Sequence, residues 1–71
     1  MNTNSTDTLT GYTTRPATFS VVNRRTREVE EIRTFPAGTE VTCRERGGLL
    51  VARVTGTLFT QDLYFSAVRP A

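Results

Sequence analysis

Arginine is the residue type through which this 71-residue chain could do most of its chemistry. All nine basic side chains are arginines, and Arg24, Arg25 and Arg27 stand almost side by side. A guanidinium group is planar, permanently charged and shaped to bind phosphate or carboxylate. The cluster therefore predicts contacts to an anionic partner such as nucleic acid. Two other interpretations stay open: the codon bias of a GC-rich genome, and a polar hairpin tip whose charge is neutralised by the neighbouring glutamates.

A second set of candidate binding residues lies further along the chain. Arg44 and Arg53 alternate with apolar residues, so both are expected on the outer face of a sheet. Leu49 and Val51 have the same outward parity, and Tyr64 could share this face. Tyrosine and arginine are frequent at protein interfaces, whereas aliphatic side chains contribute little to phosphate binding. The complete set of candidate binding residues is Arg24, Arg25, Arg27, Arg44, Leu49, Val51, Arg53 and Tyr64.

Catalysis is not expected. The sequence has no histidine, and its single cysteine, Cys43, alternates with Val41 and is expected in the core. General acid–base chemistry near neutral pH usually depends on histidine or on a strongly perturbed lysine or carboxylate. A zinc site of cysteine and histidine is excluded, and we expect no cofactor. One alternative stays open, an oligomeric enzyme that builds a shared site.

The composition limits the class of protein. The formal net charge of +2 and the pI of about 9.3 permit contact with nucleic acid but do not require it. No apolar stretch approaches the ~20 residues of a membrane span, and the N-terminus lacks a signal peptide pattern. We therefore expect one small cytoplasmic domain without a membrane contact. A chain this short buries only about 60% of its unfolded surface, so self-association would add useful stability.

A predicted hairpin positions the first arginine cluster. Residues 17–23 alternate apolar and polar side chains, which is typical of a strand. Residues 23–27 follow as the loop, opened by Asn23, whose side chain can bond backbone two residues on. Arg27 would take the left-handed conformation that ends such a loop, at a cost for any residue other than glycine.

The return strand of this hairpin, residues 28–35, has apolar residues at every third position. A β-bulge near Glu30 and Glu31 would explain this spacing in a strand. A short helix capped by Thr26 would also explain it. We favour the bulged strand because the flanking loop and strand suit a hairpin.

A second hairpin positions the second arginine set. Residues 40–46 and 49–54 alternate as strands, and Gly47-Gly48 can take the positive φ values that a two-residue turn requires. The 49–54 strand is apolar on both faces, so it is expected to be central or to have its outer face covered. Residues 63–68 are predicted to form the last strand.

Residues 1–16 are predicted to form a disordered tail, and residues 17–71 the folded domain. The tail is rich in threonine, asparagine and serine, with Leu9 and Tyr12 as its large apolar groups. Such a segment cannot bury enough surface to offset its ordering entropy. It would be a mobile terminus, or an arm that becomes ordered on a partner with Tyr12 as its anchor.

From residue 17 onward the order of elements resembles an SH3-like small barrel. The segment Phe-Pro-Ala-Gly-Thr-Glu-Val at 35–41 resembles the entry to the strand after the long loop in bacterial SH3-like modules, and Val-Arg-Pro at 68–70 resembles their exit. The resemblance implies an all-β fold of about five antiparallel strands that carries binding surfaces without fixing a function. Because the chain lacks tryptophan, a proline-rich ligand is not expected. Its size and composition are similar to those of small phage or plasmid proteins.

These observations predict a small non-catalytic interaction module. Its partner would be another protein or a second copy of the chain, docked on the outward face of the 49–53 strand. A regulatory or inhibitory role in a phage or plasmid setting would fit such a module. The alternative is a small barrel that binds nucleic acid through its surface arginines.

Overall fold

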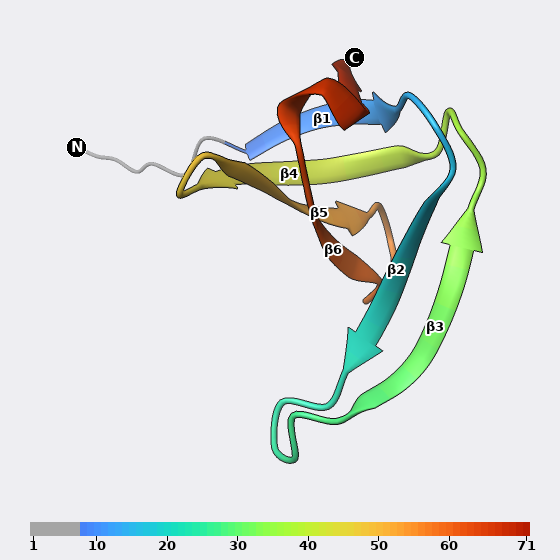
Figure 1. Cartoon of the computed structure of the whole chain (residues 1–71), viewed down its shortest axis with the longest axis vertical. Coiled ribbons are helices and arrows are strands. Elements are labelled where there is room, and N and C mark those ends of the chain that lie inside the picture. The colour runs from blue at the N-terminus through green and yellow to red at the C-terminus, as the bar shows by residue number, and fades with distance from the viewer. Residues whose placement is uncertain (1–7) are drawn as a thin grey trace.

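Seven strands form one antiparallel sheet in the computed structural model, which describes residues 8–71 (Figure 1). A single 3-10 turn, η1 (Phe65–Ala67), precedes the last strand. Across the sheet the strand order is β3-β2-β6-β5-β4-β1-β7. The all-β prediction is confirmed, but the sheet is open and has seven strands rather than about five. The strands are β1 (Thr8–Thr13), β2 (Ala17–Val22), β3 (Val29–Phe35), β4 (Glu40–Arg46), β5 (Leu49–Val54), β6 (Thr60–Leu63) and β7 (Val68–Pro70).

Strand β1 corrects the prediction that residues 1–16 form a disordered tail. It lies between β4 and β7 and pairs with both. A Cβ atom on Gly11 would lie 2.6 Å from Cγ1 of Val68 and 2.7 Å from the carbonyl oxygen of Arg69, so glycine permits this close approach. The prediction rested on the small number of apolar side chains. This threonine-rich strand is instead held by backbone hydrogen bonds to the strands on its two sides. Residues 1–7 of the predicted tail lie outside the described residues.

Thr13, at the end of β1, is buried and fully hydrogen-bonded. Its backbone N–H donates to the carbonyl oxygen of Thr39, and its own carbonyl oxygen accepts the N–H of Gly38. Its hydroxyl accepts the N–H of Thr39 at 3.1 Å and donates to the carbonyl oxygen of Pro36 at 3.2 Å. These bonds satisfy a buried polar group and tie β1 to the turn that leads into β4.

The predicted return strand is confirmed as β3, and the helix alternative is wrong. The register of β2 against β3 shifts between Val21 and Val22, which lie opposite Glu31 and Val29. Glu30 is therefore the extra residue of a β-bulge. The bulge puts Val29 and Ile32 on the same outer face of β3, whereas Phe35 points to the core.

The loop of this hairpin also has the predicted chemistry. The side-chain oxygen of Asn23 accepts the backbone N–H groups of Arg25 and Thr26, at 2.8 and 3.1 Å. The N–H of Arg27 donates to the Asn23 carbonyl oxygen at 2.7 Å, and Arg27 has a φ of 63°. Figure 1 shows this hairpin projecting away from the β1–β4–β5 part of the sheet.

The turn between β4 and β5 is the predicted two-glycine turn. Gly47 and Gly48 have φ values of 61° and 86°, and Arg46 and Leu49 pair across the turn. Strand β5 lies between β4 and β6, so the prediction that it is central is confirmed.

The predicted last strand, residues 63–68, is wrong. Strand β6 ends at Leu63, and η1 separates it from β7. The N–H of Ala67 donates to the carbonyl oxygen of Tyr64 at 2.9 Å, which closes the 3-10 turn. Phe65, the first residue of η1, is half exposed, because the turn breaks the alternation on which the predicted strand rested.

One face of the curved sheet carries the core, in which Phe19 is fully buried. The rings of Phe19 and Phe35 meet edge to face at 5.6 Å, and those of Phe35 and Phe59 at 5.3 Å. Such contacts stabilise a core beyond simple area burial. The opposite face is left for the candidate site. The buried apolar residues are Phe19, Val41, Cys43, Leu50, Ala52, Val54 and Phe59.

Candidate functional site

The outer face of the sheet holds a groove of about 320 Å³, which we call the arginine groove. Arg24, Arg44 and Arg53, far apart in the sequence, meet at it. Among the described residues no carboxylate lines it. The other lining residues are Thr8, Thr42, Cys43, Val51 and Thr60.

Pairing between β4 and β5 sets the positions of two of these arginines. Arg44 lies opposite Val51, and Thr42 lies opposite Arg53. Arg44 and Arg53 are thus diagonal neighbours, and such residues are about 7–8 Å apart in an antiparallel sheet. Because side chains alternate along a strand and Ala52 is buried, both arginines face outward.

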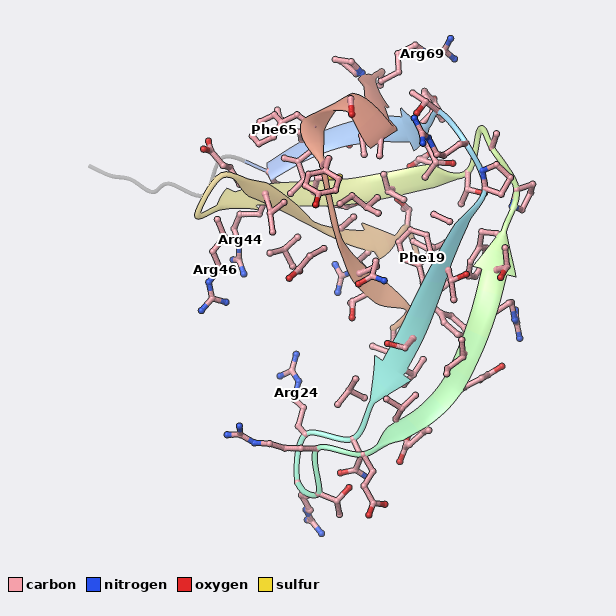
Figure 2. All side chains as sticks on the ribbon, viewed as in Figure 1. Phe19, Arg24, Arg44, Arg46, Phe65 and Arg69 are labelled. Carbon is pink, nitrogen blue, oxygen red and sulfur yellow. The ribbon has the colours of Figure 1, made fainter. Side chains whose placement is uncertain are left out.

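The third arginine, Arg24, comes from the loop of the β2–β3 hairpin. Figure 2 shows Arg24 reaching from this loop toward the sheet, while Arg44 and Arg46 project from β4 toward the loop. The loop holds this direction because Asn23 bonds the backbone of the next residues. The groove therefore has arginines on two sides.

The groove arginines lack a carboxylate partner within the described part of the chain. The one salt bridge between residues 8 and 71 joins Arg33 to Glu31, with an N–O distance of 2.9 Å, outside the groove. Two unit charges about 7 Å apart repel each other by about 0.6 kcal/mol in water. An anion bound between the arginines would replace this repulsion with attraction and charge-assisted hydrogen bonds.

A second hollow of about 380 Å³ continues the groove toward the hairpin and shares Arg24 and Arg53 with it. Its one carboxylate, Glu30, accepts a hydrogen bond from the side-chain amide of Asn23 at 2.8 Å. Three of the side chains around this hollow, Val21, Val22 and Leu58, are apolar. It is lined by Val21, Val22, Arg24, Glu30, Arg53, Leu58 and Thr60.

The other predicted binding residues lie elsewhere. Arg25 and Arg27 are exposed at the hairpin tip and do not line the groove. Leu49 is half-buried at the start of β5. Tyr64 is 75% exposed and lines a separate hollow beside the first residues of β2. The structure brings together four of the predicted binding residues, Arg24, Arg44, Val51 and Arg53.

Three threonines of the groove are not among the predicted binding residues. Thr8 lies in the predicted tail, and Thr60 lies outside the predicted strands. Thr42 and Thr60 flank Arg53 on the two neighbouring strands. The alternation of β4 could have identified Thr42, since it has the same parity as Arg44. The hydroxyl groups of Thr42 and Thr60 are already hydrogen-bonded, to the Thr55 hydroxyl and to the carbonyl oxygen of Ser20.

The single thiol of the chain is buried in the folded protein. Cys43 lies in the core with 2% of its surface exposed, and burial raises the pKa of its thiol above 9.0. A buried, protonated thiol is a poor nucleophile. No cluster of three metal-ligating side chains occurs between residues 8 and 71. Nor does this part of the chain contain a helix with the length and apolar character needed to cross a membrane.

Comparison with known proteins adds no identification. No family model matches the chain, and neither a curated protein nor a solved structure gives a significant match. The function must therefore be argued from the arginine groove itself.

Proposed function

We propose that the protein is a small non-catalytic binding module whose arginine groove takes the phosphate backbone of a nucleic acid. The observation that carries the proposal is the convergence of Arg24, Arg44 and Arg53 on one groove without a carboxylate among its described lining residues. Arginine forks bind phosphate oxygens through paired hydrogen bonds. Contacts of this kind fix a protein on the backbone without reading its sequence.

A titration tests this proposal. Fluorescence anisotropy of labelled single-stranded DNA, duplex DNA and RNA is measured against the protein over a series of salt concentrations. Three phosphate contacts predict a slope of log K against log salt of about −2 for a single strand. Binding that does not respond to salt, or that occurs only at very low salt, would contradict the proposal.

A second candidate function is the docking of an acidic protein partner on the same face. It is supported by Val51 in the arginine groove and by the exposed Val22 and Leu58 in the adjoining hollow. An acidic surface with apolar residues at its centre would complement both hollows, since interfaces combine an apolar centre with a polar rim. Such a module could regulate a larger assembly by covering its surface.

Replacing Val51 and Leu58 with serine distinguishes the two candidates. Docking of a protein partner requires these aliphatic side chains, so the double variant should be more soluble and should lose association. Phosphate binding depends on the arginines, so the same variant should keep its affinity for DNA. Unchanged partner binding in the double variant would rule out the protein-docking candidate.

The likeness to SH3-like barrels is part of this proposal. The long β2–β3 hairpin between β1 and β4 supports it, as does the 3-10 turn before β7. Small β-barrels of this kind present binding surfaces on a rigid sheet.

A further inference from the structure

Strand β3 is an unpaired edge of the sheet. It is the terminal strand in the strand order, and six of its seven residues are exposed. Within residues 8–71, only β2 pairs with it. An edge strand presents free N–H and C=O groups that can pair with another strand.

The hydrogen bonds of β2 show which β3 groups are free. The carbonyl oxygens of Thr18 and Ser20 accept bonds from side chains of β6, so both point away from β3. The backbone N–H and C=O groups alternate in direction along a strand, so those of Phe19 point toward β3, where Phe19 pairs with Arg33. On β3 the alternation then turns the N–H and C=O of Ile32 outward, to the open edge.

We propose that a second copy of this chain pairs its β3 antiparallel with this edge, with Ile32 opposite Ile32 on the two-fold axis. The two copies would exchange N–H···O bonds at this central pair. This inference goes beyond the proposed function, because the edge is separate from the arginine groove. It commits to a homodimer with an isologous interface.

The charges on β3 select this register. With Ile32 on the axis, Glu31 of each copy lies opposite Arg33 of the other. A two-fold axis at Arg33 would place like charges opposite each other, and so would an axis at Glu31. Directly opposed like charges destabilise a sheet, whereas opposite charges stabilise it. Within one copy Arg33 and Glu31 already form a salt bridge, with their side chains 58% and 52% exposed.

Side-chain packing also favours this register. Ile32, at the middle of β3, is 65% exposed. Pairing would cover it with Ile32 of the second copy. Charged residues on an edge usually prevent pairing, but here the symmetry brings opposite signs together. The bulge at Glu30 shortens the ladder, so the dimer is expected to be weak.

Sedimentation velocity of the full chain over a concentration series tests the dimer. The wild-type mass should rise from 7.9 kDa toward twice that value as the concentration approaches about 1 mM. The R33E and E31R variants, which oppose like charges in the pair, should each stay at the monomer mass. An equimolar mixture of the two should recover the dimer. In the mixed pair, the two glutamates of one copy face the two arginines of the other at positions 31 and 33.

Control variants make the result specific to β3. R25E changes the charge as R33E does but lies at the hairpin tip, so it should dimerise as the wild type does. I32R, a third variant, places like charges at the axis and should be monomeric even if R33E folds poorly. The proposal is overturned if the wild type stays monomeric at about 1 mM, if I32R or E31R dimerises normally, or if the mixture remains monomeric. If no dimer forms but E31R still binds labelled DNA, the β3 dimer is ruled out and the proposed function is not.

Discussion

Arg44 of β4 lies directly opposite Val51 of β5, on the outer face of the sheet. This pair puts an apolar side chain beside a charged one on the floor of the arginine groove. The same groove can therefore hold a phosphate group or the side chains of an acidic protein. Experiments that change charge and apolar surface separately distinguish these uses.

Gly11 tests whether β1 belongs to the fold. In Gly11→Ala the new methyl group would meet the backbone of Arg69 at 2.7 Å, so β7 must shift. Overpacking of this kind costs about 1–3 kcal/mol. Chemical denaturation should show that loss in the free energy of unfolding, while the exposed Thr10→Ala should change it by less than about 0.5 kcal/mol. Equal stability of G11A and the wild type would mean that β1 is not paired.

The hydroxyl group of Thr13 should stabilise the turn before β4. Thr13→Val removes the acceptor for the Thr39 N–H and the donor to the Pro36 carbonyl oxygen. A buried donor left without a partner costs about 1–3 kcal/mol. Thermal unfolding should rank the wild type above T13V, with T13S closer to the wild type because it keeps the hydroxyl. A T13V protein as stable as T13S would contradict this account.

Arg27 is the one non-glycine residue with positive φ in the described chain, so glycine should be better there. A left-handed L-residue carries a cost of roughly 1–2 kcal/mol. Arg27→Gly should therefore raise the free energy of unfolding by about 1 kcal/mol, after the entropy cost of glycine is subtracted. Arg25→Gly removes the same charge without relieving a strained φ and should not stabilise. If R25G and R27G change the free energy of unfolding by the same amount, Arg27 does not have the left-handed conformation.

Cys43 gives the stability a defined dependence on alkaline pH. Burial raises the pKa of its thiol in the folded chain above the usual 9.0. The unfolded chain therefore loses the thiol proton first, so the stabilisation is complete below pH 9.0 and falls as the pH rises toward the folded pKa. The slope is at most about 1.4 kcal/mol per pH unit. Denaturation of wild type and Cys43→Ala at several pH values should show their difference shrinking above pH 9.0, and a constant difference would contradict burial of the thiol.

The parts of the fold that depend on local signals could be predicted from the sequence. Asn23 and Arg27 define the first hairpin loop, and Gly47-Gly48 defines the second turn. The alternation around Cys43 also identified the core face of β4 correctly. Each signal involves residues that lie within a few positions of one another.

The parts that depend on distant pairing could not be predicted. Strand β1 has few apolar residues and exists because β4, in the middle of the chain, and β7, near its C-terminus, supply backbone partners. The site shows the same limit. Arg44 and Arg53 were placed on one face by parity, but only the fold of the hairpin brings Arg24 to them.

The measurement that tests the central claim most directly compares two double variants of equal charge. R24A/R53A removes two arginines of the groove, whereas R25A/R27A removes two exposed arginines of the hairpin tip. Each is titrated with labelled single-stranded DNA at several salt concentrations. The account predicts that R24A/R53A binds more weakly and that its salt slope is shallower by about 1.4, as for two lost phosphate contacts, while R25A/R27A stays near the wild type. Equal losses in the two variants would show that binding follows net charge, and the arginine groove would not be the site.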